Sequence, residues 1–448
     1  MLKLTRSYQL LLLAIFVLGF TSCDDDEDRP NNPVIGTIAD IVESNGDFTS
    51  LAIALERTGL DATLDVANAN VTVFAPNDAA FTAAGVDASS VDVDALRNIL
   101  LYHVISGDVQ AAEFADGEFT VNSLNTTGAG GSALPIFANN AGGSITVGGA
   151  ADNSATVVTA DVQAVNGTIH IIDDVLMPPS IVDRAVRDGR FNTLVAAVTR
   201  AGLAGVLSGA GTFTVFAPTD DAFADAGIDL DDLSDEDLGN ILKYHVLGAT
   251  VPSSAIAAGA SFPSSINTTG PDGAALSLLV NNTTDGITIN GNSNVVVADV
   301  SGNNGVVHAI DQVLMPQSIV DFVVNAPGLD SLAGAVVAAG LVETLSSDGP
   351  FTVFAPTNDA FAAIDSTVAT LSVQQLSSVL TYHVVGGANV RSDALPAMAT
   401  TVQGEDLNFS GATITTSSGQ EVAISATDIQ GTNGVVHLVP TVLLPTNL

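Results

Sequence analysis

The chain has 448 residues, with 49 acidic side chains against 11 lysines and arginines and a formal net charge of −38. This balance excludes nucleic acid as a natural partner, because binding phosphates requires clustered cations. It also disfavours adsorption of the protein surface to anionic lipid. The sequence has one cysteine, so no disulfide can form within the chain.

The first 23 residues have the architecture of a secretory signal. Lys3 and Arg6 give a positive start, an apolar run of 11 residues spans positions 10–20, and Cys23 follows. The run is too short to cross a bilayer as a helix, which needs about 20 residues. A cysteine at this place resembles the lipobox of bacterial lipoproteins, and that resemblance implies that Cys23 is acylated and anchors the chain.

Residues 24–33 are expected to form a linker. Positions 24–28 are all acidic, and Pro30 and Pro33 end the segment. Like charges keep such a segment extended. The acidic run resembles the surface-export tag of lipoproteins in the Bacteroidetes group. This resemblance implies an outer-membrane lipoprotein on the extracellular side of the cell surface, with the periplasmic face as the alternative.

One pattern then occurs three times. TVFAPNDAAF at 72–81 returns as TVFAPTDDAF at 214–223 and TVFAPTNDAF at 352–361, each followed by Tyr-His and by Asn-Gly-x-x-His. The steps between copies are 142 and 138 residues. Solenoid repeats run about 20–50 residues. The longer period therefore predicts three tandem globular domains, each able to bury its own core.

Each copy begins with two short helical patterns. In the first copy Phe48, Leu51 and Leu55 lie at helical spacing, and Gly59 marks the end of the helix. Later stretches rich in Val, Thr, Asn and Gly, such as 143–147 and 156–162, predict hairpins. Helices come first and strands later, which predicts an α+β domain.

The ten-residue block predicts a rigid corner. A strand is halted by proline, which cannot donate to the ladder, and an N-cap then starts a helix. Every position has a folding role, so we favour a structural motif without a partner. The cap and the residue after it are Asn77 and Asp78, Thr219 and Asp220, and Thr357 and Asn358.

The Tyr-His pair follows another helical stripe. In the first copy Leu96, Ile99, Leu100 and His103 share one face, which turns the histidine toward the core. We favour a hydrogen-bonded core histidine over a metal ligand. A metal would need further converging ligands, and no cysteine or His-x-His spacing supplies them. The three pairs are Tyr102–His103, Tyr244–His245 and Tyr382–His383.

The Asn-Gly-x-x-His block predicts a turn followed by a strand. Apolar residues flank each histidine two positions away, so we expect the histidines to be buried and paired. An aspartate three residues further on is a candidate partner in the first two copies, whereas the third has Pro440 there. The histidines are His170, His308 and His437, and the aspartates are Asp173 and Asp311.

These three ordered motifs resemble those of the fasciclin (FAS1, beta-Ig-H3) family. The family's first motif is met almost verbatim at 352–361, and the resemblance covers nearly everything after the linker. It implies three tandem FAS1 domains, each a wedge-shaped β-sandwich of about seven strands with several packed helices. We expect them near residues 34–178, 179–316 and 317–448.

The resemblance also implies extracellular adhesion or matrix binding, with no catalytic residue, metal or cofactor. The Tyr-His region is similar to an integrin-contact site of animal relatives, so the three Tyr-His pairs are candidate adhesion contacts, although the inward phase of the histidine favours a structural role. The leading hypothesis is a non-catalytic, lipid-anchored surface protein. Its ligand would be an extracellular protein or polysaccharide, and tandem sites would raise the effective concentration.

Two other functions are weighed against adhesion. An envelope lipoprotein that binds or processes glycan is the runner-up, but no specific carboxylate pair stands out for hydrolysis. The absence of tryptophan also disfavours sugar stacking. A calcium-responsive adhesin is suggested by the acids between Asp229 and Asp237. These lack the glycine and terminal glutamate of an EF-hand, so we favour a charged helix start.

The acidic, lysine-poor composition predicts stabilisation by salt. Without residues 1–23 the chain carries 9 cations against 49 acids, a formal charge of −40. Added ions screen the resulting self-repulsion. We expect the melting temperature of the mature protein to rise with sodium chloride, which would suit a saline habitat. A thermal-unfolding series with a non-ionic osmolyte as control tests this, and an unchanged melting temperature contradicts it.

Overall fold

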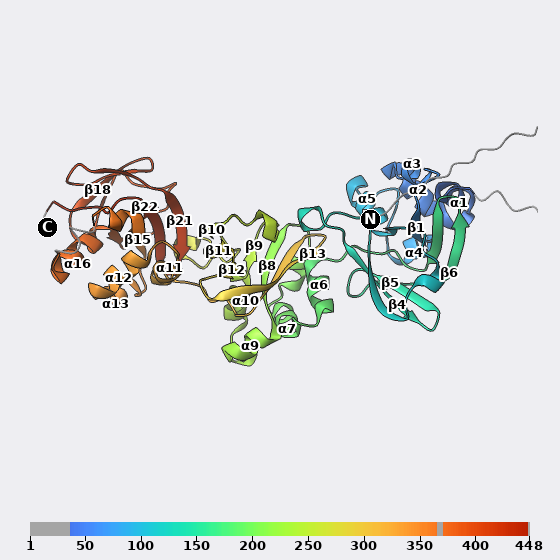
Figure 1. Ribbon diagram of the computed structural model, residues 1–448, viewed down its shortest axis with the longest axis horizontal. Coiled ribbons are helices and arrows are strands. Elements are labelled where there is room, and N and C mark those ends of the chain that lie inside the picture. Colours follow the sequence, from blue (N-terminus) through green and yellow to red (C-terminus); the bar gives the residue numbers. More distant parts are fainter. Residues whose placement is uncertain (1–35, 365–370, 447–448) are drawn as a thin grey trace, which may run out of the picture.

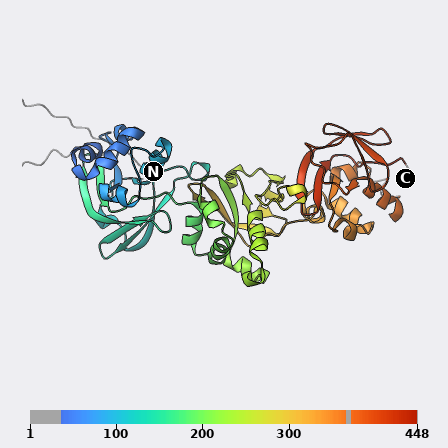
Figure 2. The ribbon, with the colours of Figure 1, turned by 180° about the vertical axis from the view of Figure 1, so that it is seen from behind.

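The structure, a computed structural model, describes residues 36–364 and 371–446. Three α+β domains follow one another in a row, and each has its own strands with helices packed against them, in one sheet in domains 1 and 2 and in two sheets in domain 3 (Figure 1). The reverse view in Figure 2 shows the same linear order. The expected fold class is confirmed.

Domain 1 runs from α1 to β7. Its helical segments are α1 (Ile38–Ser44), η1 (Gly46–Phe48), α2 (Thr49–Thr58), α3 (Asp61–Leu64), α4 (Asp78–Ala83), α5 (Val93–Tyr102), η2 (Ala111–Glu113) and η3 (Ala129–Gly131). Its strands are β1 (Val71–Pro76), β2 (Val104–Ser106), β3 (Gly117–Asn122), β4 (Pro135–Ala141), β5 (Ser144–Gly148), β6 (Ser154–Ala164) and β7 (Gly167–Ile172). They lie in the order β2-β1-β7-β6-β5-β4-β3.

Domain 2 runs from α6 to β14. Its helical segments are α6 (Ile181–Asp188), α7 (Asn192–Arg200), α8 (Ala204–Ser208), α9 (Asp220–Ala226), η4 (Leu230–Asp232), α10 (Asp235–Tyr244), η5 (Ser253–Ala255) and η6 (Pro271–Gly273). Its strands are β8 (Phe213–Pro218), β9 (Val246–Leu247), β10 (Gly259–Ser261), β11 (Val280–Thr283), β12 (Gly286–Ile289), β13 (Ser293–Gly302) and β14 (Gly305–Ile310). Their order is β10-β11-β12-β13-β14-β8-β9.

Domain 3 runs from α11 to β22. Its described helices are α11 (Ile319–Asn325), α12 (Asp330–Ala338), α13 (Val342–Leu345), α14 (Asn358–Ala362) and α16 (Val373–Tyr382). Its strands are β15 (Phe351–Pro356), β16 (Val384–Gly386), β17 (Met398–Thr400), β18 (Asp406–Ser410), β19 (Thr413–Thr415), β20 (Glu421–Ala423), β21 (Ala426–Gly431) and β22 (Gly434–Val439). They form two four-stranded sheets, β16-β15-β22-β21 and β17-β18-β19-β20.

The first strand of each domain is buried on both faces. In domain 1 all six residues of β1 are buried. Side chains alternate along a strand, so Val73 joins the core under the helices while Phe74 joins a second core inside the bent sheet. Each domain therefore has one core on its helical side and one on its sheet side.

The second repeated motif pairs with the first in parallel. β7 lies beside β1, with Val71 opposite Gly167 and Phe74 opposite His170. Gly167 has φ +152°, and a Cβ added there would lie 1.8 Å from the Val71 carbonyl oxygen. No other residue fits so close to the neighbouring strand. This contact explains the glycine of the Asn-Gly pair.

The predicted corner after the first strand is confirmed. Asn77 caps α4 by accepting a 2.9 Å hydrogen bond from the Ala80 N–H. The next residue, Asp78, accepts a 2.7 Å bond from the Ser50 N–H in the first turn of α2. One dipeptide thus caps two helices. The equivalents of Asp78 are Asp220, which accepts from the Thr193 N–H at 2.7 Å, and Asn358, which accepts from the Ser331 N–H at 2.9 Å.

The helix cap made by Asp220 gives a stability prediction. Burial alone would raise its pKa, but hydrogen bonds from Thr193 and Asn192 outweigh that cost and leave the pKa below its usual value. Asp220→Ala should destabilise domain 2 by about 1 kcal/mol above pH 4, as for other lost caps. Because the folded pKa is lowered, the difference from wild type should shrink as the pH falls through that pKa.

Calorimetry of the mature chain measures this change. Asp220→Asn should retain most of the stability, since Asn358 holds the equivalent place in domain 3. Asp225→Ala, at an exposed position on the same helix, is the matched control. Equal melting temperatures for the Asp220→Ala and Asp225→Ala variants would contradict the capping role.

Candidate functional site

The Tyr-His pair lies at the end of a helix, between the two cores. α5 ends at Tyr102, and His103 is its C-cap residue. The Tyr102 hydroxyl donates to the Pro135 carbonyl at 2.6 Å. The Nδ1–H of His103 donates to the Ile99 carbonyl at 2.8 Å, and its Nε2 accepts from the Leu176 N–H at 2.9 Å. This histidine holds the helix to the segment after the last strand.

The other two copies repeat this geometry. His245 bridges the Ile241 carbonyl and the Leu314 N–H, both at 2.8 Å. His383 bridges the Val379 carbonyl and the Leu443 N–H. The prediction of a hydrogen-bonded core histidine is confirmed. Exposed fractions are 0% for Tyr102, Tyr244 and Tyr382, 2% for His103, and 1% for His245 and His383.

Burial limits what these pairs can contact. A partner reaching the side chains would have to displace core residues, so the adhesion role of the six residues stays a prediction without an exposed side-chain surface. Burial also lowers the pKa of His103, His245 and His383 to about 4, against a smaller upward effect of the hydrogen bond to the backbone carbonyl. Burial raises the pKa of Tyr102 and Tyr244. All five are neutral at pH 7.

The second histidine of each copy uses the opposite tautomer. His170 donates through Nε2–H to the Val109 carbonyl at 3.0 Å and accepts at Nδ1 from the Asp161 N–H at 3.3 Å. Burial lowers its pKa as well. His308 and His437 make the equivalent bonds, to Val251 and Asp299 and to Val390 and Asp428. The expectation that these histidines are buried and paired is confirmed.

The hypothesis that the aspartate of this motif pairs with the histidine is wrong. Asp173 accepts a 2.6 Å hydrogen bond from the Thr156 N–H, and Asp311 accepts a 2.7 Å bond from the Asn294 N–H. Each fixes the start of the long bent strand. The histidine forms its hydrogen bonds with backbone groups instead. Pro440 in domain 3 therefore removes no hydrogen bond from His437.

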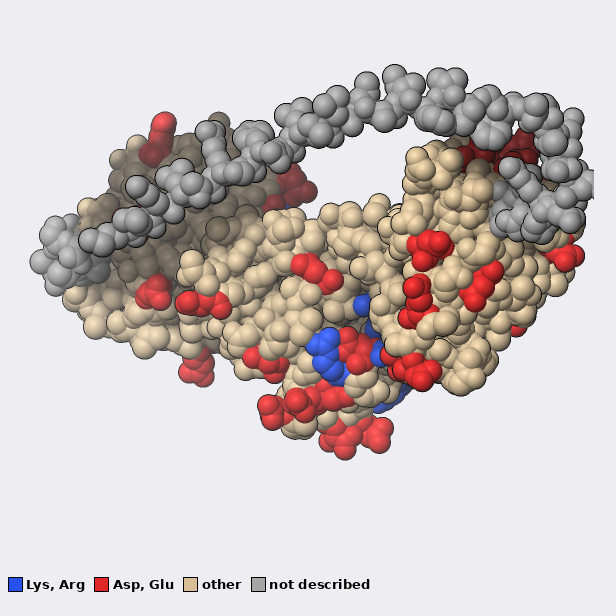
Figure 3. Space-filling model, turned by 45° about the vertical axis from the view of Figure 1, so that its right-hand side comes forward, with Lys and Arg blue, Asp and Glu red and all other residues tan. Residues whose placement is uncertain are grey.

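The acidic cluster between Asp229 and Asp237 begins a helix, as favoured from the sequence. Ser234 caps α10 by accepting from the Asp237 N–H at 3.1 Å. Asp235 is paired with Arg200 at 2.9 Å. Within residues 36–364 and 371–446, no group of three or more His, Cys, Asp or Glu side chains is placed to hold a metal ion. The face drawn in Figure 3 carries acidic side chains along its length and basic ones in one small region.

The domains meet through contacts that the repeated motifs do not include. At the first junction, Arg184 and Arg187 of α6 lie over the Phe137 ring of domain 1, at 4.9 and 4.8 Å from its centroid. Such contacts are worth about 0.5–2 kcal/mol each. Asp183 of the same helix accepts a 2.9 Å bond from the Ala151 N–H. The first helix of domain 2 is thereby fixed to domain 1.

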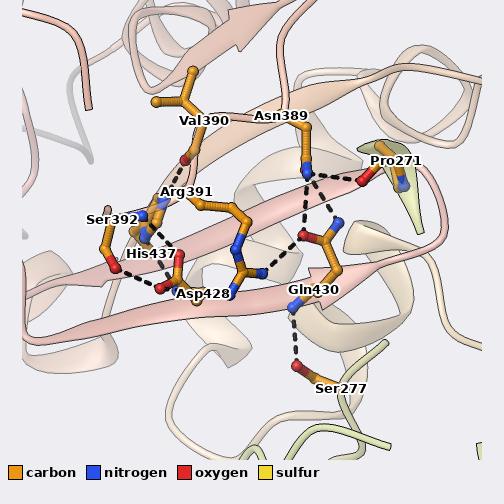
Figure 4. A network of polar contacts seen from close by, with 9 residues as sticks. All are labelled: Pro271, Ser277, Asn389, Val390, Arg391, Ser392, Asp428, Gln430 and His437. Carbon is orange, nitrogen blue, oxygen red and sulfur yellow. Dashed lines mark hydrogen bonds and ion pairs between the residues drawn. The ribbon is translucent and has the colours of Figure 1, made fainter. Parts of the chain in front are cut away.

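A glycine-rich turn makes the second part of each junction. In domain 1 the turn at 128–132 reaches the end of β13, where Ser132 Oγ donates to Ser301 Oγ at 3.0 Å. In domain 2 the turn at 270–274 reaches the end of β21. There Asn389 donates to the Pro271 carbonyl at 3.3 Å, and the Gln430 N–H donates to Ser277 Oγ at 3.0 Å (Figure 4).

Both turns are built the same way. Asn125 is fully buried and accepts from the Thr127 N–H at 2.8 Å, and Asn267 does the same with Thr269. A Cβ on Gly270 would lie 2.7 Å from the Ala274 carbonyl oxygen and 3.2 Å from Gln430 Cγ. The glycine is therefore required by the turn and by the approach of the next domain.

These junction residues were missed in the sequence, although a signal exists. Asn-Thr-Thr-Gly occurs at 125–128 and 267–270, in the first two copies only. Both turns that begin with this motif contact the next domain, so a motif shared by these two copies was the available signal for a junction element. Cys23, the predicted lipid anchor, lies outside the described residues.

His245, one of the two buried histidines of domain 2, gives a pH prediction. Its pKa of about 4 lies below the ordinary 6.5, so its stabilising contribution is complete above pH 6.5 and is lost as the pH falls toward 4. This loss amounts to roughly 3 kcal/mol. His245→Gln can keep both hydrogen bonds without titrating. We expect the domain-2 transition of the variant to lose correspondingly less stability between pH 6.5 and 4 than that of wild type.

Calorimetry at several pH values tests this expectation. His245→Leu is the control for loss of both hydrogen bonds, and it should be destabilised by about 1–3 kcal/mol above pH 6.5. Because leucine does not titrate, its deficit relative to wild type should shrink as the pH falls toward 4. If the stability of domain 2 falls equally with pH in wild type and in His245→Gln, then His245 does not control the loss of stability in acid.

Comparisons with known proteins agree with this architecture. The family model of the Fasciclin domain matches residues 46–178, 189–316 and 327–445. The transforming growth factor-beta-induced protein ig-h3 of Sus scrofa is 29% identical over 430 residues, which cover 93% of this chain and 59% of that protein. Periostin of Homo sapiens is 30% identical over 330 residues, 70% of this chain and 36% of periostin.

A bacterial relative and a solved structure were also found. Protein sll1483 of Synechocystis is 40% identical over 133 residues, 29% of this chain and 73% of that protein. A FAS1 domain pair from the insect cell adhesion molecule Fasciclin I aligns with a TM-score of 0.37 at 22% identity, over 59% of this chain and 95% of that one. The chain thus spans little more than half of ig-h3 and about a third of periostin. With three matched segments covering most of its length, the chain belongs to the fasciclin domain family.

Proposed function

We propose that this protein is a non-catalytic adhesion or matrix-binding protein that acts outside the cytoplasm through three FAS1 domains. The observation that carries the proposal is the row of domains joined by direct contacts at both junctions. A row of this kind presents several surfaces at fixed spacing. Weak sites held in this way gain effective concentration for a repetitive ligand.

The surfaces that differ between copies are the proposed contact regions. The shared motifs are used within each domain: Asp78 caps a helix and His170 bridges two backbone groups. The exposed faces carry most of the excess of acids, and the ligand should therefore be neutral or basic. An extracellular protein or a polysaccharide with few anionic groups meets this requirement.

We further propose that Cys23 is lipidated and that the chain stands on the outer face of the outer membrane. The predicted linker at residues 24–33 would then tether the row. Within the part of the chain that the structure describes, no helix is long and apolar enough to cross a membrane.

Glycan binding is the second candidate, and one observation favours it. A surface hollow of about 430 Å³ lies on the sheet of domain 1, next to the junction with domain 2. It is lined by polar residues such as Glu118, Asn139 and Arg187 together with Phe119 and Phe137. Polar groups beside an aromatic ring suit a sugar, so a polysaccharide ligand would be expected here.

Protease treatment of intact cells tests the proposed location. We expect peptides of all three domains to be released by an external protease and identified by mass spectrometry. A Cys23→Ala variant should leave the membrane fraction, because the anchor is then lost. If no peptides appear while known surface proteins are cleaved, surface adhesion is excluded.

A separate treatment of the surface to which the protein adheres distinguishes the two ligand classes. Binding that survives proteolysis of that surface but not its periodate oxidation would assign a polysaccharide ligand.

A further inference from the structure

The two junctions have different side chains at one equivalent place on the sheet. In domain 2, Phe262 directly follows β10, and its ring lies 6.2 Å from the ring of Phe322 on α11. The step of 142 residues between the first two copies makes Thr120 the equivalent of Phe262. Arg184 is the equivalent of Phe322, since each is the fourth residue of its helix. The first junction therefore has a short polar side chain and a cation where the second has two packed rings.

This place at the first junction is the hollow of about 430 Å³ on the sheet of domain 1. Thr120 lies opposite Phe137, and Phe137 lies opposite Gly148, which has no side chain. Arg187 of α6 lines the hollow from the side of domain 2. The hollow is therefore shared by both domains and depends on their contact.

The floor of the hollow carries polar side chains on one face of the sheet. Glu118 lies opposite Asn139, and Asn139 lies opposite Thr146 in the next strand. Within residues 36–364 and 371–446, the side chains of Glu118, Thr120 and Asn139 form no hydrogen bond with another protein group. A ligand rich in hydroxyl groups can pair with all of them, whereas a tyrosine or tryptophan side chain brings only one polar group. The hollow thus suits a sugar better than an aromatic side chain.

The charges around the hollow favour a neutral sugar. Glu118 lines it from domain 1 and Arg187 from domain 2, where Arg187 donates to the Ala150 carbonyl at 3.1 Å and keeps further N–H groups for a ligand. The guanidinium of Arg184 is half-buried over the Phe137 ring and is not among the lining groups. An acidic sugar would be repelled by Glu118 and by the net charge of −38. A hydroxyl group, in contrast, donates to a carboxylate and accepts from a guanidinium.

We infer that this hollow binds one ring of a neutral polysaccharide, in the place that Phe262 occupies at the second junction. Hydroxyl groups of the ring donate to Glu118 and accept from Arg187. Because these residues belong to different domains, the bound sugar also stabilises the contact between domains 1 and 2. The inference names the ligand class for the glycan-binding candidate and rests on that proposed function. The polar residues that line the site are Glu118, Thr120, Asn139, Thr146, Ser154 and Arg187.

Calorimetric titration of the mature chain with oligosaccharides tests the ligand class. The neutral probes are oligomers of glucose, mannose and galactose, and the acidic probes are oligomers of mannuronate and galacturonate. We expect at least one neutral probe to bind, and to bind more tightly than its acidic counterpart. The absence of binding by every neutral probe, or equal or tighter binding of the acidic probes, overturns the inference.

Substitutions copied from the second junction assign the site. Thr120→Phe introduces the residue that domain 2 has at this place, so the chain should fold while the ring fills the hollow and weakens binding at least about tenfold. Arg187→Asn, which copies Asn325 of α11, should weaken binding about tenfold, as expected for one lost hydrogen bond to a charged group. Thr159→Phe, at an exposed position of β6 outside the hollow, is the matched control. Unchanged binding by either folded variant of the site overturns the inference.

A second measurement tests whether the sugar contacts both domains. In scanning calorimetry the bound probe should raise the melting temperatures of domains 1 and 2 but not that of domain 3, because a ligand stabilises the domains that it binds. A shift confined to one domain overturns the shared site. These measurements use the isolated chain, so their failure leaves surface location and adhesion to a protein standing. Failure of the protease test on cells would, in turn, leave sugar binding by the isolated chain standing.

Discussion

The parallel pairing of the first and last strands is the constraint on which each domain depends. It places the two repeated motifs side by side, with Phe74 opposite His170 and their rings 5.7 Å apart. The pairing is non-local, because almost 100 residues separate the strands. Gly167 allows the close approach at one end, and Asn166 ties the same place to the first helix through a 2.9 Å bond from the Ile38 N–H. The motif residues are thus fixed by one long-range contact.

The paired strands also position two histidines in each domain. Each histidine forms hydrogen bonds with backbone groups that are not paired within a helix or a sheet. His103 joins a helix end to the segment after the last strand, and His170 joins the strand to the loop at Val109. A neutral imidazole offers one donor and one acceptor on two ring nitrogens that point in different directions, which suits a buried bridge between a carbonyl and an N–H. Its burial is tolerable because both ring nitrogens are used, as buried polar groups require.

Sequence patterns predicted those features of the fold that depend on interactions between residues close in the chain. Helix spacing, Gly59 as a stop, and the cap at Asn77 were readable because each depends on residues within one turn. The burial of His103 was readable from helical phase. The partner of His170 was not, because backbone groups of Asp161 and Val109 leave no trace in side-chain identity. The junctions were missed because they join residues 32 to 169 positions apart, although the Asn-Thr-Thr-Gly repeat marks one side of them.

The two junctions share geometry but differ in chemistry, and this difference bears on rigidity. At the first junction α6 meets domain 1 through two arginines over Phe137, whereas at the second Leu279 of domain 2 belongs to the same apolar cluster as Phe322 of α11. Apolar burial is insensitive to ionic strength, and cation–π contacts are weaker where solvent reaches them. The second junction should therefore hold its angle more firmly than the first. Domains 2 and 3 then form the stiffer pair, and domain 1 is the part of the row best able to change its angle.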